Sequence, residues 1–273
     1  GNEEGLVTCW NFNSGSGDIL YDHSGNGNHG TIHGATWVEN IYGCTDELAE
    51  NYNSEANWDD GSCTYPDNGD YSLIFDGDDD YISFGEYVPT SLQIQDSITI
   101  SARIKISEYP PLASNSLRTI VGCQLDEFFG YAIHLDNRLI NGSIHFQIGG
   151  SNGWNEVNTT TSIPLNQWVN IVATRKSGQE PKIYFDGVSQ PTQQPENYNY
   201  NNWDGEILYS DTEFYIGRQK NIPDRDFEGL INKVSLWNKI FQEEDLFFLN
   251  DIEYPEEYLN GYWKFNTGSG DTL

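Results

Sequence analysis

Short oxygen-bearing side chains gather in the segment Asp22–Gly30, where they offer the chemistry of a hard cation site. Asp22, Asn26, Asn28 and His29 lie there among glycines that let backbone carbonyls turn inward. Calcium takes about six to eight oxygen ligands, so this loop is a candidate calcium site. The alternative is that the two asparagines simply satisfy the left-handed geometry of tight turns.

A second acidic segment contains Asp76, Asp78, Asp79 and Asp80 within five residues. Carboxylates placed so closely repel one another unless water or a cation neutralises them. We therefore take Asp76 and Asp78 as further candidate calcium ligands. A solvated hairpin turn is the equal alternative.

Aromatic side chains in polar loops offer a different chemistry, because flat rings stack on the apolar faces of sugars. The polar segment 190–205 is longer than an ordinary connection and combines rings with amides. Another ring lies in a second loop, and an arginine follows a strand-like run. The candidate carbohydrate-binding residues are Trp154, Tyr198, Tyr200, Asn202, Trp203 and Arg218. For the two tryptophans, local packing within the loops is the alternative.

Catalytic constellations are not evident in the sequence. Glycoside hydrolysis needs two carboxylates that flank one bond, and no Glu-x-Asp-x-x-Glu run occurs. The G-x-S-x-G, H-E-x-x-H and P-loop patterns are also absent. The five histidines are dispersed with no obvious partner spacing. The sequence therefore predicts a protein that is not an enzyme, and a divergent glycoside hydrolase is the less favoured alternative.

Net charge narrows the class of partner. The chain has 13 basic and 42 acidic residues, a net charge of −29, which repels nucleic acids and anionic membranes. The sequence contains no run of about 18 apolar residues, so we expect neither a transmembrane helix nor membrane insertion. We expect a polysaccharide or glycoconjugate as partner. The start at GNEEG is interpreted as that of a mature or excised fragment.

Four cysteines indicate the compartment. Cys44 and Cys63 bound a polar insert, residues 43–66, and we expect them to form a disulfide, which could stabilise the fold by about 3 kcal/mol. Such pairing predicts an oxidising, extracellular or cell-surface location. Cys9 and Cys123 lie in apolar runs and either pair or remain buried thiols, the second being favoured.

The insert also contains acidic residues and is a third candidate for calcium. Its acidic candidates are Asp46, Asp59 and Asp60, which all lie between the two cysteines. They are carboxylates in a segment without strand periodicity. Carboxylate oxygens are ligands that calcium takes.

The chain ends by repeating its beginning. Residues 6–20 read LVTCWNFNSGSGDIL and residues 259–273 read LNGYWKFNTGSGDTL. We infer one domain over residues 1–258, followed by residues 259–273 as the first strand of a second, truncated repeat, with further repeats in the parent chain. A strand without its domain is expected to dock loosely. The alternative is that Leu259–Phe265 is the last strand of the first domain.

Most of the chain alternates short β runs with turn signals, the pattern of a sandwich. In Ser97–Ile106 apolar and polar residues alternate, so one face is expected in the core and the other in water. Asp186-Gly187 predicts a tight hairpin, and Gln242–Leu249 a short helix that caps a sheet. Tryptophans amid apolar residues are expected in the core. They are Trp10, Trp168 and Trp237.

Seven motifs in order resemble those of bacterial laminin-G-like, or concanavalin A-like lectin/glucanase, domains. They include GLVTCWNFNSGSGDILYDHSGNGNHG, LIFDGDDDYISFG, SITISARIKI, NQWVNIVATRKSG, KIYFDG, FYIGRQ and FEGLINKVSLWNKIF. This resemblance implies an all-β jelly-roll sandwich of two antiparallel sheets. It also implies a structural calcium near the N-terminal loops and the last long strand, with Asn232 as a possible ligand where the family has aspartate. The insert resembles a CTD…NYN…DDGSC element of secreted bacterial surface proteins.

These observations together predict a non-catalytic, calcium-stabilised carbohydrate-binding or adhesion module of a secreted or cell-surface multidomain protein. A structural spacer, or a protein-binding adhesin domain without a glycan ligand, is the alternative. Tandem repetition and negative charge fit both interpretations.

Overall fold

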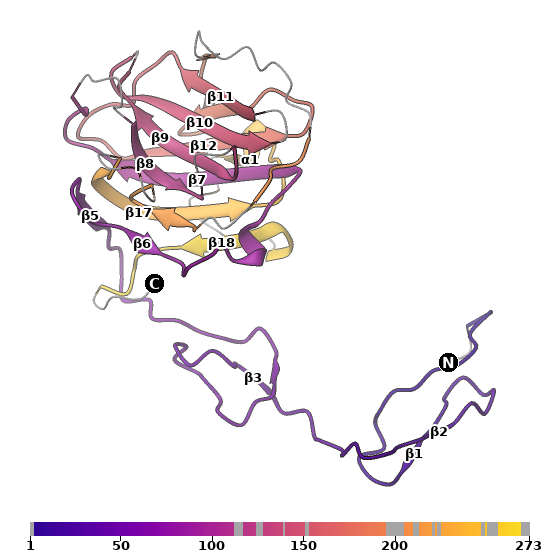
Figure 1. The fold of residues 1–273 in the computed structure, drawn as a ribbon. Helices are drawn as coiled ribbons and strands as arrows, with labels where there is room; N and C mark the ends of the chain where they lie inside the picture. The colour runs from indigo at the N-terminus through magenta and orange to yellow at the C-terminus, as the bar shows by residue number, and fades with distance from the viewer. Residues whose placement is uncertain are drawn as a thin grey trace. The chain divides into compact units, whose positions relative to one another are not determined.

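The computed structural model describes residues 3–111, 117–123, 128–138, 140–150, 153–194, 205–209, 213–219, 222, 225–246, 249 and 256–268. The chain divides into two compact units, residues 1–67 and 68–273 (Figure 1). The sequence placed residues 1–258 in one domain, whereas the boundary in the structure follows Asp67. Among the described residues, no helix is long and apolar enough to cross a membrane.

The larger unit is a sandwich of two antiparallel sheets with seven strands each, which confirms the predicted all-β jelly-roll class (Figure 1). The first sheet has the order β15 (Thr192–Gln193), β11 (Gly153–Thr159), β10 (Ser143–Gly150), β9 (Tyr131–Asp136), β8 (Leu117–Gly122), β16 (Tyr215–Ile216) and β6 (Ile82–Ser83). The second has the order β14 (Val188–Ser189), β13 (Lys182–Phe185), β12 (Val169–Lys176), β7 (Ser97–Lys105), β17 (Glu228–Trp237) and β18 (Leu259–Trp263), and β5 (Leu73–Asp76) also pairs with β17. Two 3₁₀ turns, η1 (Thr90–Leu92) and η3 (Glu256–Tyr258), precede β7 and β18.

The smaller unit contains two short pairs of strands. β1 (Ile19–Leu20) pairs antiparallel with β2 (Gly30–Thr31), and β3 (Tyr42–Gly43) pairs in parallel with β4 (Trp58–Asp59). Its described residues contribute few buried apolar side chains, Cys44 and Ala49 among them. Turns and hydrogen bonds therefore carry more of its structure than a core does.

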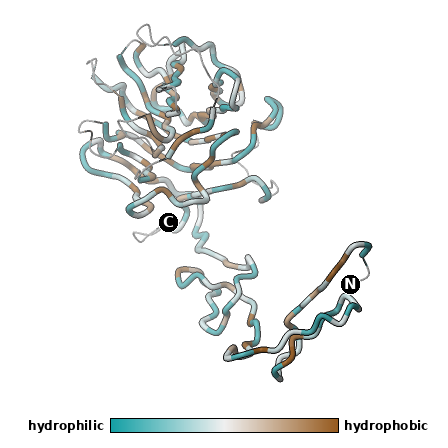
Figure 2. Tube along the Cα trace, turned by 45° about the vertical axis from the view of Figure 1, so that its right-hand side comes forward, coloured by the Kyte–Doolittle hydropathy of each residue, from teal (hydrophilic) through white to brown (hydrophobic). Residues whose placement is uncertain are grey.

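The sandwich core follows from alternation along the strands. Ile98, Ile100 and Ile104 of β7 are fully buried and belong to one apolar cluster with Ile133 and Phe146 of the facing sheet. Figure 2 shows hydrophobic stretches alternating with hydrophilic ones along the chain of the larger unit. Burial of each such side chain contributes about 1.5–3 kcal/mol, so the inward face of β7 holds the two sheets together.

The outward face of β7 differs from the prediction of a solvated surface. Thr99 and Ser101 are buried, because a second apolar cluster that includes Trp237 covers this side of the sheet. The Ser101 hydroxyl donates to Asn170 Oδ1 over 2.9 Å, which satisfies a polar group under that layer. The helix α1 (Glu243–Leu246) supplies Leu246 to the same cluster and thus caps the sheet as expected.

The predicted hairpin at Asp186-Gly187 is present. Both residues have positive φ, 48° and 80°, and they connect β13 to β14. This is the backbone that a two-residue hairpin needs, and glycine adopts it without a steric cost.

The final segment of the chain is an ordered edge strand. β18 pairs antiparallel with β17, placing Trp263 opposite Val234. The Trp263 ring lies 4.8 Å from Phe84 and 5.5 Å from Phe214 between ring centroids, and Phe265 is 3% exposed. The expectation of loose docking is therefore wrong, because this aromatic pair completes the sandwich core. That the segment begins a further repeat stays a prediction.

The equivalent residues at the other end of the chain have no such core. Trp10 is 42% exposed and Phe12 65% exposed, so the expectation that Trp10 is buried is wrong. Of the two other tryptophans expected in the core, Trp237 is fully buried and Trp168 is half-buried. Nearly the same sequence is thus buried at one end of the chain and exposed at the other.

Two single substitutions should separate these environments. Phe265→Ala should lower the free energy of unfolding by about 3–5 kcal/mol, as for other buried phenylalanines. Phe12→Ala should change it by less than about 0.5 kcal/mol, since the ring is mostly exposed. Urea unfolding followed by intrinsic fluorescence measures both. Equal effects of the two substitutions would contradict the assignment of β18 to the core.

Candidate functional site

The turn between β5 and β6 gathers carboxylates at the edge of the sandwich. One carboxylate oxygen from each of Asp76, Asp79 and Asp80 lies within 4.8 Å of the others. The Asp76 amide donates to Asp80 Oδ2 over 2.9 Å, and the Asp78 amide donates to Asp76 Oδ1 over 3.0 Å. These bonds fold the turn back on itself. Asp78, which we expected as a ligand, supplies its backbone to this turn, and Asp79 and Asp80 complete the carboxylate group.

β17 fixes the position of this turn. Asp76 is directly opposite Glu228 in the antiparallel pair of β5 with β17. Gly77 has a φ of 83°, and a side chain there would come within 3.4 Å of Glu228 Oε2. A glycine thus lets a fourth carboxylate approach the turn.

The geometry of this acidic turn fits a calcium ion. Calcium–oxygen distances of about 2.3–2.6 Å place ligands on opposite sides of one ion up to about 5 Å apart. The observed limit of 4.8 Å among the three oxygens agrees with that spacing. Two of the three carboxylates are exposed, so water could complete the coordination.

An aromatic ring and a cation adjoin the acidic turn. Tyr81, which follows Asp80, is 48% exposed, and the Arg218 guanidinium carbon lies 4.3 Å from its ring centroid. Arg218 Nε is 3.5 Å from Asp226 Oδ1 but has no hydrogen-bond partner. A strand-end turn positions the arginine, since Gly217 packs against Phe75 and the Asp80 carbonyl. Arg218 Nε is buried, but the Arg218 side chain as a whole is 31% exposed, so its guanidinium and the Tyr81 ring can both contact a sugar.

Asn232 does not join this turn. Its Nδ2 donates to the Tyr71 carbonyl over 2.6 Å and to Asp70 Oδ1 over 3.2 Å. Those partners precede β5, whereas Asp76 ends it. Asn232 therefore fastens the entry of β5 to β17, and the structure does not bring it together with Asp76 and Asp78.

The Asp22 loop forms a hydrogen-bonded clamp. Asp22 Oδ1 accepts the backbone amides of Cys9 and Ser24, both over 2.9 Å, and Oδ2 accepts the amide of Asn28 over 2.9 Å. Loss of solvent would raise the pKa of Asp22, but these amides outweigh it and hold the pKa below its usual range. The carboxylate is therefore occupied by donors.

The other candidate ligands of this loop serve the same clamp. The Nδ2 groups of Asn26 and Asn28 donate to the Val7 carbonyl over 3.0 and 2.9 Å. His29 Nδ1 accepts the Asp22 amide over 3.0 Å. As placed, these groups bind residues 6–9 to the loop and do not converge as oxygen ligands. Calcium at this loop stays a prediction that the contacts do not support.

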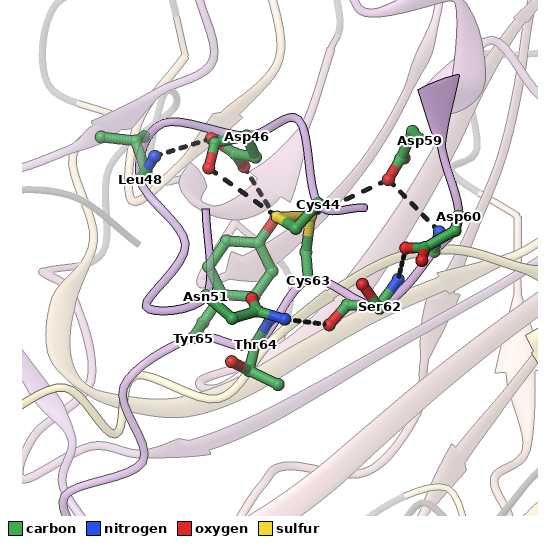
Figure 3. The surroundings of a disulfide bond; sticks show 11 residues. Cys44, Asp46, Leu48, Asn51, Asp59, Asp60, Ser62, Cys63, Thr64 and Tyr65 are labelled. Atoms are coloured by element: carbon green, nitrogen blue, oxygen red, sulfur yellow. Dashed lines mark hydrogen bonds between the residues drawn. A yellow bond between two sulfur atoms is a disulfide. The ribbon is translucent and has the colours of Figure 1, made fainter. Parts of the chain in front are cut away.

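The disulfide between Cys44 and Cys63 is present, with 4.7 Å between the Cα atoms (Figure 3). Asn51 ties the two ends of its loop together, donating to the Ser62 carbonyl over 2.6 Å and accepting the Thr64 amide over 2.7 Å. Cys9 and Cys123 are free thiols, half-buried and buried respectively, which agrees with the favoured alternative for the second. The insert is thus a small unit closed by one bridge.

Acidic residues of the insert bond to their own loop. Asp46 accepts the Leu48 amide and the Tyr65 hydroxyl, and both bonds lower the pKa of its carboxyl (Figure 3). Asp60 accepts the Ser62 amide over 3.0 Å. These carboxylates therefore act as caps of turns.

The predicted sugar-binding aromatics do not form one surface in the described structure. Trp154 is 9% exposed, and its ring lies 5.5 Å from that of Phe128. It therefore packs locally, which was the alternative. Four further candidates lie outside the described residues. They are Tyr198, Tyr200, Asn202 and Trp203.

A buried polar row crosses β8 to β11, and the sequence analysis missed it. Thr119, His134 and His145 lie on neighbouring strands in register, with the two imidazoles 5.5 Å apart between centroids. His145 Nε2 is 2.7 Å from Glu156 Oε2. Histidines that are dispersed in the sequence thus meet in the fold. The alternation in YAIHLD and SIHFQ, which places both imidazoles on the face opposite the core, is the signal that could have found them.

Charges at the end of this row are paired. Arg138 binds Asp136 through Nε and NH2 at 3.0 and 2.8 Å. Burial raises the pKa of Asp136, but the Arg138 guanidinium outweighs it and the net shift is downward. Burial, with His145 and two arginines nearby, lowers the pKa of His134 well below its usual value. The members of the row are buried, which favours a structural role.

The comparison with known families decides the classification. A model of the concanavalin A-like lectin/glucanases superfamily matches residues 76–247, more than half of the chain. The chain belongs to this superfamily. No sequence among the curated proteins matches it. The match begins at the acidic turn and ends beside α1, so it covers most of the sandwich, without β18, and none of the smaller unit.

Several solved structures resemble this chain at low sequence identity. A candidate carbohydrate-binding protein from Bacteroides ovatus has 17% identity and a TM-score of 0.52, over 81% of this chain and 60% of that one. A SAP-like pentraxin from Limulus polyphemus has 13% identity and a TM-score of 0.47, over 71% and 91%. The CBM40 of a Ruminococcus gnavus IT-sialidase, solved with α2,3 sialyllactose, has 10% identity and a TM-score of 0.43, over 62% and 95%.

The polar row of this lectin-like sandwich should make stability depend on pH. In the unfolded chain His134 takes up a proton below about pH 6.5, whereas in the folded chain its pKa is well below that value. Acidification therefore lowers the free energy of unfolding, by up to about 1.4 kcal/mol per pH unit. Asp136, whose folded pKa is also lowered, acts at lower pH, around its usual 3.8. The measurement is the free energy of urea unfolding between pH 7.5 and pH 5.

Two variants isolate the histidine. His134→Asn should flatten this slope, whatever its effect on absolute stability. His33→Asn, at an exposed histidine of the smaller unit, should leave the slope unchanged. An identical slope in His134→Asn and the parent chain would show that His134 titrates normally in the fold.

Proposed function

We propose that this chain is a non-catalytic carbohydrate-binding module, and that the glycan binds at the edge formed by Tyr81, Arg218 and the acidic turn. The observation that carries the proposal is the exposed ring of Tyr81 under the Arg218 guanidinium, 4.3 Å away, beside three clustered carboxylates. Family membership supports binding of sugars in general. The site then supplies a stacking surface and a hydrogen-bond donor.

Calcium is the ion that this edge best accommodates. Asp76, Asp79 and Asp80 would hold it, with Glu228 close by across the strand pair. A bound cation would offset the mutual repulsion of the carboxylates and fix the turn that carries Tyr81. It would also present a positive charge to sugar hydroxyls. The Asp22 loop and the insert offer carboxylates that are already hydrogen-bonded, so they are weaker candidates.

The location that fits this function is extracellular or at the cell surface. The disulfide of the insert is compatible with an oxidising compartment. The strong net negative charge of −29 favours solvation in saline surroundings. We further propose that the module is part of a larger chain with related repeats, which rests on the duplicated LxxxWxFN segment.

Removal of two carboxylates should weaken calcium binding. Asp79→Asn/Asp80→Asn should weaken calcium affinity by about tenfold or more, because affinity follows the number of charged ligands. Asp59→Asn/Asp60→Asn, a matched pair in the insert, should leave it unchanged. Isothermal calorimetry of each variant with calcium chloride measures both. Loss of binding only in the second variant would place calcium in the insert.

Binding to a panel of polysaccharides and glycoconjugates, with calcium and with chelator, tests the ligand. Arg218→Gln should reduce the affinity of the best glycan by about tenfold, because it removes a hydrogen-bond donor to the sugar. Arg103→Gln, which removes a similar arginine 5.7 Å from the Trp168 ring, should not change it. Equal loss in both variants would refute the assigned edge. A panel without any bound glycan would favour a structural spacer or a protein-binding module.

A further inference from the structure

The two copies of the repeated segment share a backbone conformation but not an environment. Phe12 and Phe265 both have a φ of 54°, in the left-handed region that phenylalanine rarely adopts. Phe265 is 3% exposed, whereas Phe12 is 65% exposed. In the second copy this backbone conformation directs the Phe265 ring into the core of the sandwich. The first copy has the same φ at its phenylalanine, but the ring there is mostly exposed.

Other apolar side chains of the first copy are exposed as well. Val7 is 71% exposed and Trp10 is 42% exposed (Figure 2, where the stretch after the N-terminus is hydrophobic). Burial of these side chains against a partner would remove apolar surface from water, which favours binding. Contiguous exposed apolar side chains on a soluble protein commonly mark an interaction surface.

The clamp described above holds this segment ready for pairing. Asp22 Oδ1 accepts the Cys9 amide over 2.9 Å, and the His23 amide donates to the Cys9 carbonyl over 2.7 Å. Asn26 and Asn28 fix the Val7 carbonyl. The segment is thus extended and ordered before any partner binds, which reduces the entropy that binding would cost.

We propose that Leu6–Phe12 is a donor strand that completes the sheet of another laminin-G-like sandwich, by pairing with the long strand equivalent to β17. In this chain that edge is already filled by β18, so the acceptor is a different domain of the same kind whose edge is open. The inference goes beyond glycan binding and does not depend on it.

β18 supplies the register of the proposed contact. In the chain's own sandwich, Tyr262 is opposite Ser235 and Trp263 is opposite Val234. By the repeat, Cys9 takes the place of Tyr262 and Trp10 that of Trp263. Trp10 and Phe12 would then enter the core of the acceptor, as Trp263 and Phe265 do here. Addition of a strand to an open sheet edge is an established mode of recognition.

One position differs between the copies and constrains the acceptor. Gly261 corresponds to Thr8, and a side chain at 261 would overlap the ring of Trp263. The tryptophan ring must therefore shift slightly in an acceptor that receives Thr8. A graft of the first copy into β18 should therefore retain Gly261.

A graft within the intact chain tests whether the donor sequence fits. Asn260→Val/Tyr262→Cys/Lys264→Asn gives β18 the sequence of the first copy except at Gly261. We expect the melting temperature to change by less than about 3 °C, which corresponds to about 1 kcal/mol for a domain of this size. A fall as large as that caused by Phe265→Ala would overturn the proposal, because the donor would then not fit the edge.

Disulfide trapping between two intact chains tests the contact itself. The acceptor has its own edge strand weakened by Trp263→Ser/Phe265→Ser and also carries Cys9→Ser and Ser235→Cys. The donor is the unmodified chain, whose Cys9 is a free, half-buried thiol. We expect a covalent dimer that links donor Cys9 to the cysteine introduced at 235, identified by peptide mass mapping, since opposed strand residues are close enough for a disulfide.

Two controls define the outcome. An acceptor with Lys233→Cys in place of Ser235→Cys, two residues out of register, should give less trapping. A donor with Trp10→Ser/Phe12→Ser should give none. Trapping that is equal at both positions, or that persists without the two rings, would overturn the proposal. If the weakened acceptor does not fold, the graft decides the question alone.

Discussion

The sandwich depends on the pairing of β17, because this strand holds three others in place. One edge of β17 pairs with β7, whose inward isoleucines form the core. The other edge is shared by β5 and β18, which pair with its first and last parts respectively. β5 leads into the acidic turn, and β18 brings Trp263 and Phe265 into the core. The site and the closure of the fold therefore depend on the same strand.

Contacts with β5 and β17 explain why the proposed binding edge can be rigid although its side chains are exposed. Glu228 fixes Asp76 at one end of the strand pair, and Asn232 fastens the entry of β5 further along. Gly217 packs against Phe75 and the Asp80 carbonyl, which sets the position of Arg218. Tyr81 and Arg218 thus stand on elements anchored in the core, and little ordering would be needed when a ligand binds.

Local patterns in the sequence predicted the parts of the fold that depend on local physics. Alternation in Ser97–Ile106 and the Asp186-Gly187 pair predicted a strand and a hairpin correctly, since each follows from a few neighbouring residues. The sequence could not show which copy of LxxxWxFN enters the sandwich, because identical residues serve both places. Nor could it show that Asp22 is surrounded by amide donors, or that His134 and His145 meet, because both depend on pairing between distant segments.

The most direct test of the account is amide hydrogen exchange of the whole chain, measured alone, with calcium, and with calcium plus the best glycan. The account predicts slower exchange of the segments Asp76–Tyr81 and Gly217–Arg218, first with calcium and further with the glycan. β7 and β12 should be unaffected, because they lie in the core. Protection confined to Asp22–His29, to the Cys44–Cys63 loop or to β11 would contradict the assignment of the binding edge.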